Sequence, residues 1–238
     1  MRARGVAAFL LALVVSSSAL AGPENSTIGA KKLDAEAVNN VGVGFPSIFY
    51  EWWNRGSGSL DWALSGELVY GDWASFTTSG ARAFGFRARN RLVRIGFGVN
   101  GHLRWHLAKK ERSKVTNDMA FLFKPGLLVA GNTQSTFTFA IRTELGAPVS
   151  IDVHDRVSIV TGGFIPLTFY VNSDIPNGAT LPLLLRVGVE IDAGNKVAPW
   201  FFFDFGPGVN FVYSGPLEGN DIAFAWRLGA GTAFWGIR

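Results

Sequence analysis

The chain has 238 residues, of which 48% are hydrophobic and 17% charged, and its formal net charge at pH 7 is +4. A charge balance this close to neutral favours neither nucleic acid nor an acidic macromolecule as a partner. The absence of cysteine excludes disulfide bonds, a thiol nucleophile and any metal site that contains cysteine. The length suits a single all-β domain.

The N-terminus has the three parts of a secretory signal peptide. Two arginines lie within the first four residues, residues 6–15 are apolar, and residues 19–21 place alanine at the two positions that a signal peptidase reads. The apolar run is about half as long as the roughly twenty residues of a membrane-spanning helix. We therefore expect a cleaved signal peptide over residues 1–21 and an exported chain that begins at Gly22. Its net charge would be +2, from 20 basic and 18 acidic residues.

Residues 22–40 are polar and follow neither a helical nor a strand period. A segment without an apolar face has little to bury, so we expect a mobile N-terminal tail here. Residues 41–238 contain no linker, and we expect them to form one domain.

Alternation of apolar and polar residues, the mark of a strand, begins at residue 41. Over residues 41–53 the apolar positions change parity at Pro46, which predicts one strand with a β-bulge. Residues 60–70 alternate cleanly, with leucine and aromatic residues at most even positions and Asp61 and Glu67 between them. Residues 76–89 alternate weakly and are the best candidate for a further strand.

Residues 92–108 show the clearest alternation in the chain. From Val93 to Leu107 the odd positions are apolar apart from Gly101, and the even positions carry arginine, glycine, asparagine or histidine. At about 3.3 Å per residue such a strand is about 50 Å long, whereas strands of soluble proteins usually end after five or six residues. This length is typical of a strand that crosses a membrane at a tilt.

The same pattern recurs in the second half of the chain, over residues 137–145, 181–191, 201–213 and 222–234, and more weakly over 118–130 and 157–171. Stretches rich in Gly, Asn, Asp, Ser and Pro separate these segments and mark chain reversals. They lie at residues 54–59, 131–134, 172–180, 193–196 and 214–220. The strands number nine without residues 76–89 and ten with them.

One face of these strands is rich in Phe, Leu, Val and Trp, and the other in Gly and in Arg with Asp or Glu. Tryptophans lie near segment ends, where an interfacial aromatic girdle would be: Trp52, Trp53, Trp73, Trp105, Trp200 and Trp235. With the signal peptide, this mixture resembles the bacterial outer-membrane β-barrel class over about residues 41–238. The resemblance implies an all-β, antiparallel up-and-down transmembrane barrel of about ten strands, or eight if two weak segments are loops. It also implies a monomer in the bacterial outer membrane, with outer-membrane lipid, and lipopolysaccharide as a further candidate, as partners.

The polar faces of the strands would line the barrel lumen. The predicted lumen residues are Asp61, Glu67, Arg94, His102, Arg104, His106, Lys124, Arg142, Glu144, Arg186, Glu190, Asp192, Asp204 and Arg227. Their six cationic and six acidic side chains balance. Small barrels hold side chains inside but little water, so we expect a filled lumen rather than an ion-selective pore.

None of the motifs that could indicate a catalytic or binding site has the spacing and the context that such a site requires. Four residues along a strand, His102 and His106 are about 13 Å apart and cannot share a zinc ion. The glycine pattern of residues 96–101 matches a dinucleotide-binding turn but continues as strand instead of helix. Asp152 and His154 could orient a hydrolytic serine, but no partner serine can be named, and a solvated turn is the simpler reading.

We therefore expect no catalytic centre, metal or cofactor, and a role in envelope structure or small-scale permeability. A narrow ion or small-solute channel, a lipid-modifying outer-membrane enzyme and a soluble periplasmic β-protein remain as alternatives. The basic stretch 109–114 would be a solvated turn on the periplasmic side, or a grip for lipopolysaccharide phosphates if it faced outward.

Overall fold

The computed structural model describes Pro23 and residues 25–70, 95–112, 115–131, 137–173, 177–213 and 219–236. The signal peptide and the weak strand expected over residues 76–89 lie outside these described residues. No helix in the described part of the chain is long and apolar enough to cross a membrane.

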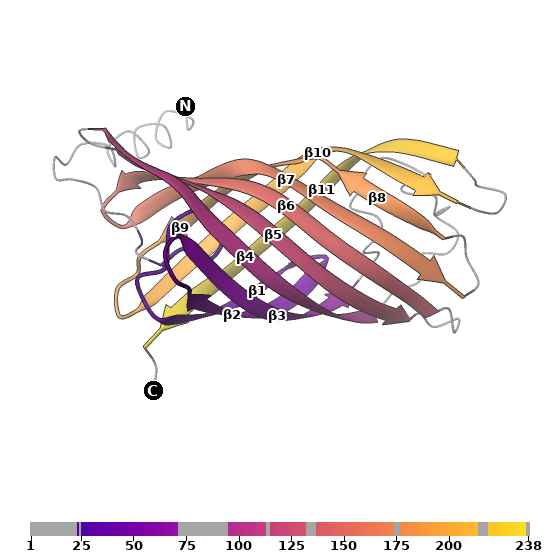
Figure 1. Ribbon diagram of the computed structural model, residues 1–238, viewed down its shortest axis with the longest axis horizontal. Coiled ribbons are helices and arrows are strands. Elements are labelled where there is room, and N and C mark those ends of the chain that lie inside the picture. Colours follow the sequence, from indigo (N-terminus) through magenta and orange to yellow (C-terminus); the bar gives the residue numbers. More distant parts are fainter. Residues whose placement is uncertain are drawn as a thin grey trace, which may run out of the picture.

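The described residues form one antiparallel sheet that closes on itself as a barrel (Figure 1). The strands are β1 (Ala37–Phe45), β2 (Ser47–Arg55), β3 (Leu60–Tyr70), β4 (Ile95–Arg112), β5 (Val115–Gly131), β6 (Phe137–His154), β7 (Val157–Asn172), β8 (Gly178–Pro182), β9 (Leu184–Ile191), β10 (Val197–Val212) and β11 (Gly219–Trp235). Each strand from β1 to β7 pairs with the next, and β11 pairs with both β10 and β1, which closes the ring. The expected all-β antiparallel barrel is confirmed.

The barrel has ten strand positions because β8 and β9 share one of them. Both lie between β7 and β10, and only Leu183 separates them. The register with β10 is unchanged across the gap, since Pro182 pairs with Gly208 and Leu185 with Phe205. The interruption faces Pro207, which has no N–H for the ladder. The expected count of about ten is therefore confirmed.

The single bulged strand expected over residues 41–53 is wrong. Residues 37–55 form a hairpin in which β1 and β2 pair antiparallel, with Val43 opposite Ile48 and Ala37 opposite Asn54. Pro46 lies in the turn between them, so the change of parity marks a chain reversal. This hairpin supplies the tenth strand position that the sequence assigned to residues 76–89.

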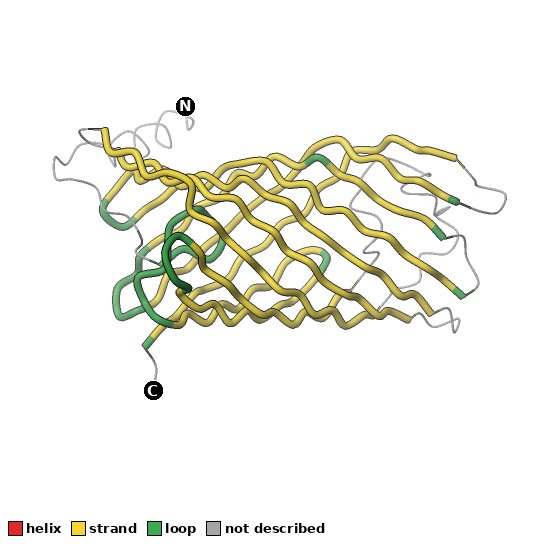
Figure 2. Tube along the Cα trace, viewed as in Figure 1, coloured by secondary structure: helices red, strands yellow, loops and turns green. Residues whose placement is uncertain are grey.

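The two ends of the barrel differ. The start of β1, the end of β11 and the connections at residues 56–59, 155–156 and 192–196 lie at one end, which we call the plug end (Figure 2). The end of β4 and the start of β5 lie there too. The ends of β3, β5, β7 and β10 and the starts of β4, β6, β8 and β11 lie at the other end, which we call the far end. The β1–β2 turn points toward the far end but stops short of it, because Phe45 pairs with Leu228 and β11 continues from there to Gly219. In the sequence, the connections between the far ends of the strands have 5–24 residues, and those between the plug ends have 2–5.

The N-terminal segment is not the tail expected over residues 22–40. The first strand begins at Ala37, and residues 25–31 and Leu33 are buried inside the barrel at the plug end (indigo in Figure 1). We call residues 25–36 the plug. Its polar main chain is buried because side chains of the barrel wall satisfy its hydrogen bonds, as described below.

The two faces of each strand differ as the alternation predicts. In β4, Phe97 and Val99 are 62% and 47% exposed on the outside, whereas His102 and Arg104 are 3% and 1% exposed inside. The assignment of Trp53 and Trp200 to the aromatic girdle is wrong, because both side chains are buried in the lumen. Trp73 lies outside the described residues.

Small inward residues let large rings fill the lumen. The indole of Trp200 stacks between Phe49 and Phe202, with ring centroids 5.8 and 5.7 Å away. A Cβ at Gly42 or Gly231 would lie 2.6 or 2.5 Å from the Trp200 ring. Glycine is therefore required opposite this stack, and part of the lumen is filled by aromatic rings.

Candidate functional site in the barrel lumen

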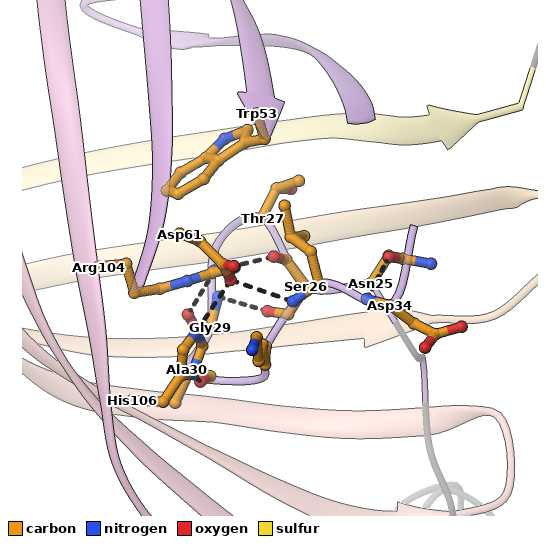
Figure 3. Close-up of polar contacts among 12 residues, drawn as sticks. Asn25, Ser26, Thr27, Gly29, Ala30, Asp34, Trp53, Asp61, Arg104 and His106 are labelled. Carbon is orange, nitrogen blue, oxygen red and sulfur yellow. Dashed lines mark hydrogen bonds and ion pairs between the residues drawn. The ribbon is translucent and has the colours of Figure 1, made fainter. Parts of the chain in front are cut away.

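The plug is a closed loop whose two ends meet. Asn25 Oδ1 accepts hydrogen bonds from the backbone N–H groups of Asp34 and Ala35, at 3.0 and 2.9 Å (Figure 3). The chain between them enters the lumen, turns and returns, like other compact loops with adjacent ends. Only the bond from Glu36 to Ala37 joins the plug covalently to the wall.

One carboxylate of β9 binds the beginning of the plug. Glu190 accepts hydrogen bonds from the Ser26 hydroxyl at 2.6 Å and from the backbone N–H groups of Thr27 and Ile28 at 3.0 and 3.1 Å. Glu190 is only 2% exposed. A buried carboxylate needs such donors because its desolvation is costly.

An arginine of β4 binds the carbonyl groups of the same turn. Arg104 donates hydrogen bonds to the carbonyl oxygens of Ser26 and Gly29, at 2.8 and 3.1 Å, and to Asp61 Oδ2 at 3.0 Å (Figure 3). Its guanidinium also lies over the Trp53 ring, 4.6 Å from the centroid. Arg104 is thus held by wall residues in a position from which it binds the plug.

Asp61 and His106 bind the returning part of the plug. Asp61 Oδ2 accepts a hydrogen bond from the backbone N–H of Leu33 at 3.0 Å and lies 2.8 Å from His106 Nε2. The other ring nitrogen of His106 lies 2.8 Å from the carbonyl oxygen of Ala30. Both histidines of β4 thus face the lumen, and His106 contacts plug and wall at once.

The plug also has one ion pair with the wall. Lys31 Nζ lies 2.6 Å from Asp152 Oδ1, and the Ala30 N–H donates to Ser150 Oγ at 2.8 Å. The solvated-turn interpretation of Asp152 is therefore wrong: Asp152 is 1% exposed and also accepts a hydrogen bond from Ser158. Its place on the inward face of β6 decides this.

Two apolar side chains complete the docking of the plug. Ile28 packs with Val160, Trp200 and Phe202, and Leu33 packs in a second cluster that includes Trp53. Burying a side chain of this size contributes roughly 1.5–3 kcal/mol. The plug is therefore held by apolar contacts as well as by hydrogen bonds.

A second layer of charged side chains lies farther along the lumen than the plug, and all of its members belong to strands of the wall. Arg186 donates to both oxygens of Asp204 at 2.8 Å, and Arg227 Nε donates to Asp204 Oδ2 at 2.6 Å. Arg227 also pairs with Glu144. Arg186 reaches the plug through one hydrogen bond, to the Ile28 carbonyl at 3.1 Å.

The remaining predicted charges, Glu67, Lys124 and Arg142, pair farther from the plug end. Arg142 pairs with Glu67 and donates a hydrogen bond to Asn100 Oδ1 at 2.9 Å. Lys124 Nζ lies 3.9 Å from Glu51 Oε1, and its side chain is 26% exposed. Lys124 therefore faces open space in the lumen.

That space is a cavity of about 140 Å³ between the plug and the far end. Thr27, Ile28 and Gly29 of the plug line it at one end, and Phe45, Pro46 and Ser47 of the β1–β2 turn line it at the other. A water needs roughly 10–15 Å³ of such space, so the cavity has room for about ten waters. The plug therefore borders a space that has room for water.

The structure brings most of the predicted lumen residues together, with two exceptions. Arg94 lies outside the described residues. Asp192 lies in the β9–β10 turn, where Oδ1 accepts a hydrogen bond from the Gly194 N–H at 2.8 Å, so its assignment to the lumen is wrong. Glu51 was missed, although it shares the inward parity of Trp53, and the plug gave no periodic signal at all.

A serine and a histidine do meet in the lumen, although the sequence did not pair them. Ser65 Oγ lies 2.9 Å from His102 Nε2, and Glu51 Oε1 lies 3.8 Å from that same nitrogen. A hydrolytic triad needs its carboxylate on the other ring nitrogen, Nδ1, and no described residue supplies it. Of the two, His102 lines the cavity, whereas Ser65 is 7% exposed and does not line it.

The described residues do not provide the structural context that the metal and cofactor motifs of the sequence would need. Among them, no group of three or more His, Asp or Glu side chains could hold a metal ion. The glycine pattern at residues 96–101 lies inside β4, as its alternation predicts. His154 lies at the end of β6, where Nδ1 accepts a hydrogen bond from the backbone N–H of Arg156 at 3.3 Å.

Comparison of the chain with protein-family models and with curated proteins finds no match.

Proposed function

We propose that this chain is an integral outer-membrane β-barrel whose own N-terminal plug closes the lumen, and that it serves envelope structure rather than catalysis. The observation that carries the proposal is the inverted distribution of polarity. Large apolar side chains on the outside of the barrel are 37–76% exposed, while charged side chains such as Asp61, Arg104 and Asp204 are buried within.

Lipid explains this distribution better than water does. An exposed apolar surface that encircles a molecule would drive aggregation in water, whereas the hydrocarbon of a membrane requires it. A closed barrel also pairs the backbone groups of each strand, which hydrocarbon demands because it offers no hydrogen bonds. A soluble periplasmic β-protein would bury the apolar face and expose the charged one.

The difference between the two ends supports an orientation. Bacterial outer-membrane barrels have short periplasmic turns and longer extracellular loops. The plug end, with the short connections and the C-terminal strand end, would then face the periplasm. The basic stretch at residues 109–114 belongs to that end, which favours a solvated turn over a site for lipopolysaccharide.

Export and membrane insertion are tested by fractionation. The mature protein should begin at Gly22 by mass spectrometry, co-sediment with outer membranes, resist extraction by high salt and dissolve only in detergent. An intact barrel should also migrate differently on a gel before and after boiling. Recovery in the soluble periplasmic fraction without detergent would contradict the proposal.

A single substitution distinguishes lipid from water around the barrel. Val99 is 47% exposed on the outside of β4. Near the bilayer midplane, Val99→Arg should lower the free energy of unfolding by about 2–4 kcal/mol, measured by denaturant titration in lipid vesicles. Val99→Leu, which keeps the site apolar, is the matched control and should change stability little. If water surrounds the barrel, the arginine too should cost no more than about 0.5 kcal/mol.

A further inference from the structure

We propose that the barrel is a cation-selective pore closed by its own plug, so that displacement of the plug opens a path for small cations. The inference deepens the proposed function and rests on the barrel lying in a membrane. It concerns a permeation activity that a purely structural barrel would lack.

A path already extends through part of the lumen. The cavity of about 140 Å³ reaches from Thr27, Ile28 and Gly29 to the β1–β2 turn, which lies beside the middle of β11. The plug stands between this cavity and the other mouth of the barrel. Its removal would join the cavity to the plug end and leave a channel as wide as the folded loop that now fills it.

The wall does not depend on the plug to stay closed. The sheet is continuous around the barrel, and its pairings involve only the strands. The ion pairs of Asp204 with Arg186 and Arg227, and of Arg142 with Glu67, join wall residues to one another. An empty lumen would therefore keep its shape.

The charge of the wall determines which ions would pass. Eight inward-facing carboxylates belong to described strand residues: Glu51, Asp61, Glu67, Asp118, Glu144, Asp152, Glu190 and Asp204. Seven cations of described strand residues share that face, with histidines left aside: Arg55, Arg104, Lys109, Lys124, Arg142, Arg186 and Arg227. Eight against seven is nearly balanced, so the selectivity would come from the carboxylates whose partners belong to the plug, because carboxylates left without a cation favour cations over anions.

Two of these wall carboxylates, Asp152 and Glu190, have partners in the plug. Lys31 pairs with Asp152 and also interacts electrostatically with Asp118. The three hydrogen bonds described for Glu190 all come from Ser26, Thr27 and Ile28. When the plug leaves, these carboxylates remain on the wall near the plug end, where entering cations would meet them.

The direct test is deletion of residues 25–35, studied in planar bilayers with a potassium chloride gradient. The wild-type protein should show little conductance. The deletion variant should show discrete current steps, with a reversal potential displaced toward the equilibrium potential of potassium. Adding Glu190→Gln and Asp152→Asn to the deletion should move the permeability ratio of potassium to chloride toward one. A folded, heat-modifiable deletion variant that does not conduct, or that prefers chloride, would overturn the inference.

Two full-length variants test the inference even if the deletion variant fails to fold. A Cβ at residue 29 would collide with Ser150 Oγ and lie 2.7 Å from Ser26 Oγ, so Gly29→Phe should undock the plug and conduct if the deletion variant fails to fold. The natural chain has no cysteine, so the pair Ala30→Cys and Ser150→Cys, at residues already joined by a hydrogen bond of 2.8 Å, can lock the plug by oxidation. The oxidised protein should not conduct, and the reduced protein should conduct. Identical current recordings from the two redox states would contradict a displaceable plug. These results leave the proposed membrane location untouched, because fractionation tests it separately.

Discussion

Replacing Asp204 with asparagine should lower the free energy of unfolding by about 3–5 kcal/mol, the usual cost of leaving buried charges without their partner. Asp204 is 0% exposed and binds Arg186 and Arg227 at 2.6–2.8 Å. Asparagine has the same size but no charge, so Arg186 would lose its ion-pair partner and Arg227 would keep only its pair with Glu144. Denaturant titration in vesicles, with the gel shift on boiling as readout, measures the effect.

The control for this variant is Glu36→Gln, which removes a carboxylate that is exposed at the start of β1. It should change stability by no more than about 0.5 kcal/mol. Combining Asp204→Asn with Arg227→Met should recover part of the loss, because coupled sites are not additive. If Asp204→Asn were as mild as the control, the lumen charges would be hydrated and screened, as in a wide aqueous pore.

Replacing Arg104 with alanine should destabilise the barrel by a similar amount, about 3–5 kcal/mol, and should also loosen the plug. Arg104 is 1% exposed, and it binds Asp61 together with the carbonyl oxygens of Ser26 and Gly29. The substitution leaves a buried carboxylate with no arginine and frees two plug carbonyls. Faster hydrogen exchange at residues 26–33 would report the loosening, and denaturant titration the loss of stability.

Arg55 provides the matched control for Arg104. It is an exposed arginine that also donates to a plug carbonyl, that of Asp34, at 2.6 Å. Because water can replace an exposed contact, Arg55→Ala should cost at most about 1 kcal/mol and leave hydrogen exchange within the lumen unchanged. Equal effects of the two variants would show that burial of Arg104 contributes nothing to plug docking.

The sequence correctly predicts the barrel and the facing of most strand residues. Alternation is a local property, and a closed sheet with one face in the lumen converts it directly into inside and outside. That is why Asp61, Arg104, Arg142 and Arg227 could be assigned to the lumen before any register was known. The same pattern cannot distinguish a bulge from a tight turn, because both change the parity, and Pro46 was misread for that reason.

The pairing of the lumen charges needed the tertiary structure. Arg142 and Glu67 lie on β6 and β3, which are not neighbours in the barrel, so neither alternation nor strand order predicts that they meet across the lumen. Trp53 and Trp200 were misassigned for a different reason. Their position near segment ends resembled an interfacial girdle, although their parity in the sequence already placed them inside, where they are buried.

What the sequence determines by itself is the architecture: strands of alternating polarity, their approximate number, and a polar interior inside an apolar surface. Only the tertiary structure decides that the interior is occupied by the chain's own N-terminus. The plug has no period and little apolar surface, so nothing in its residues predicts burial. Its hydrogen bonds are satisfied by side chains far away in the sequence, as between Ser26 and Glu190, which are 164 positions apart. Such contacts exist only once the barrel has closed around them, because closure is what brings β3, β4, β6 and β9 to face a common lumen.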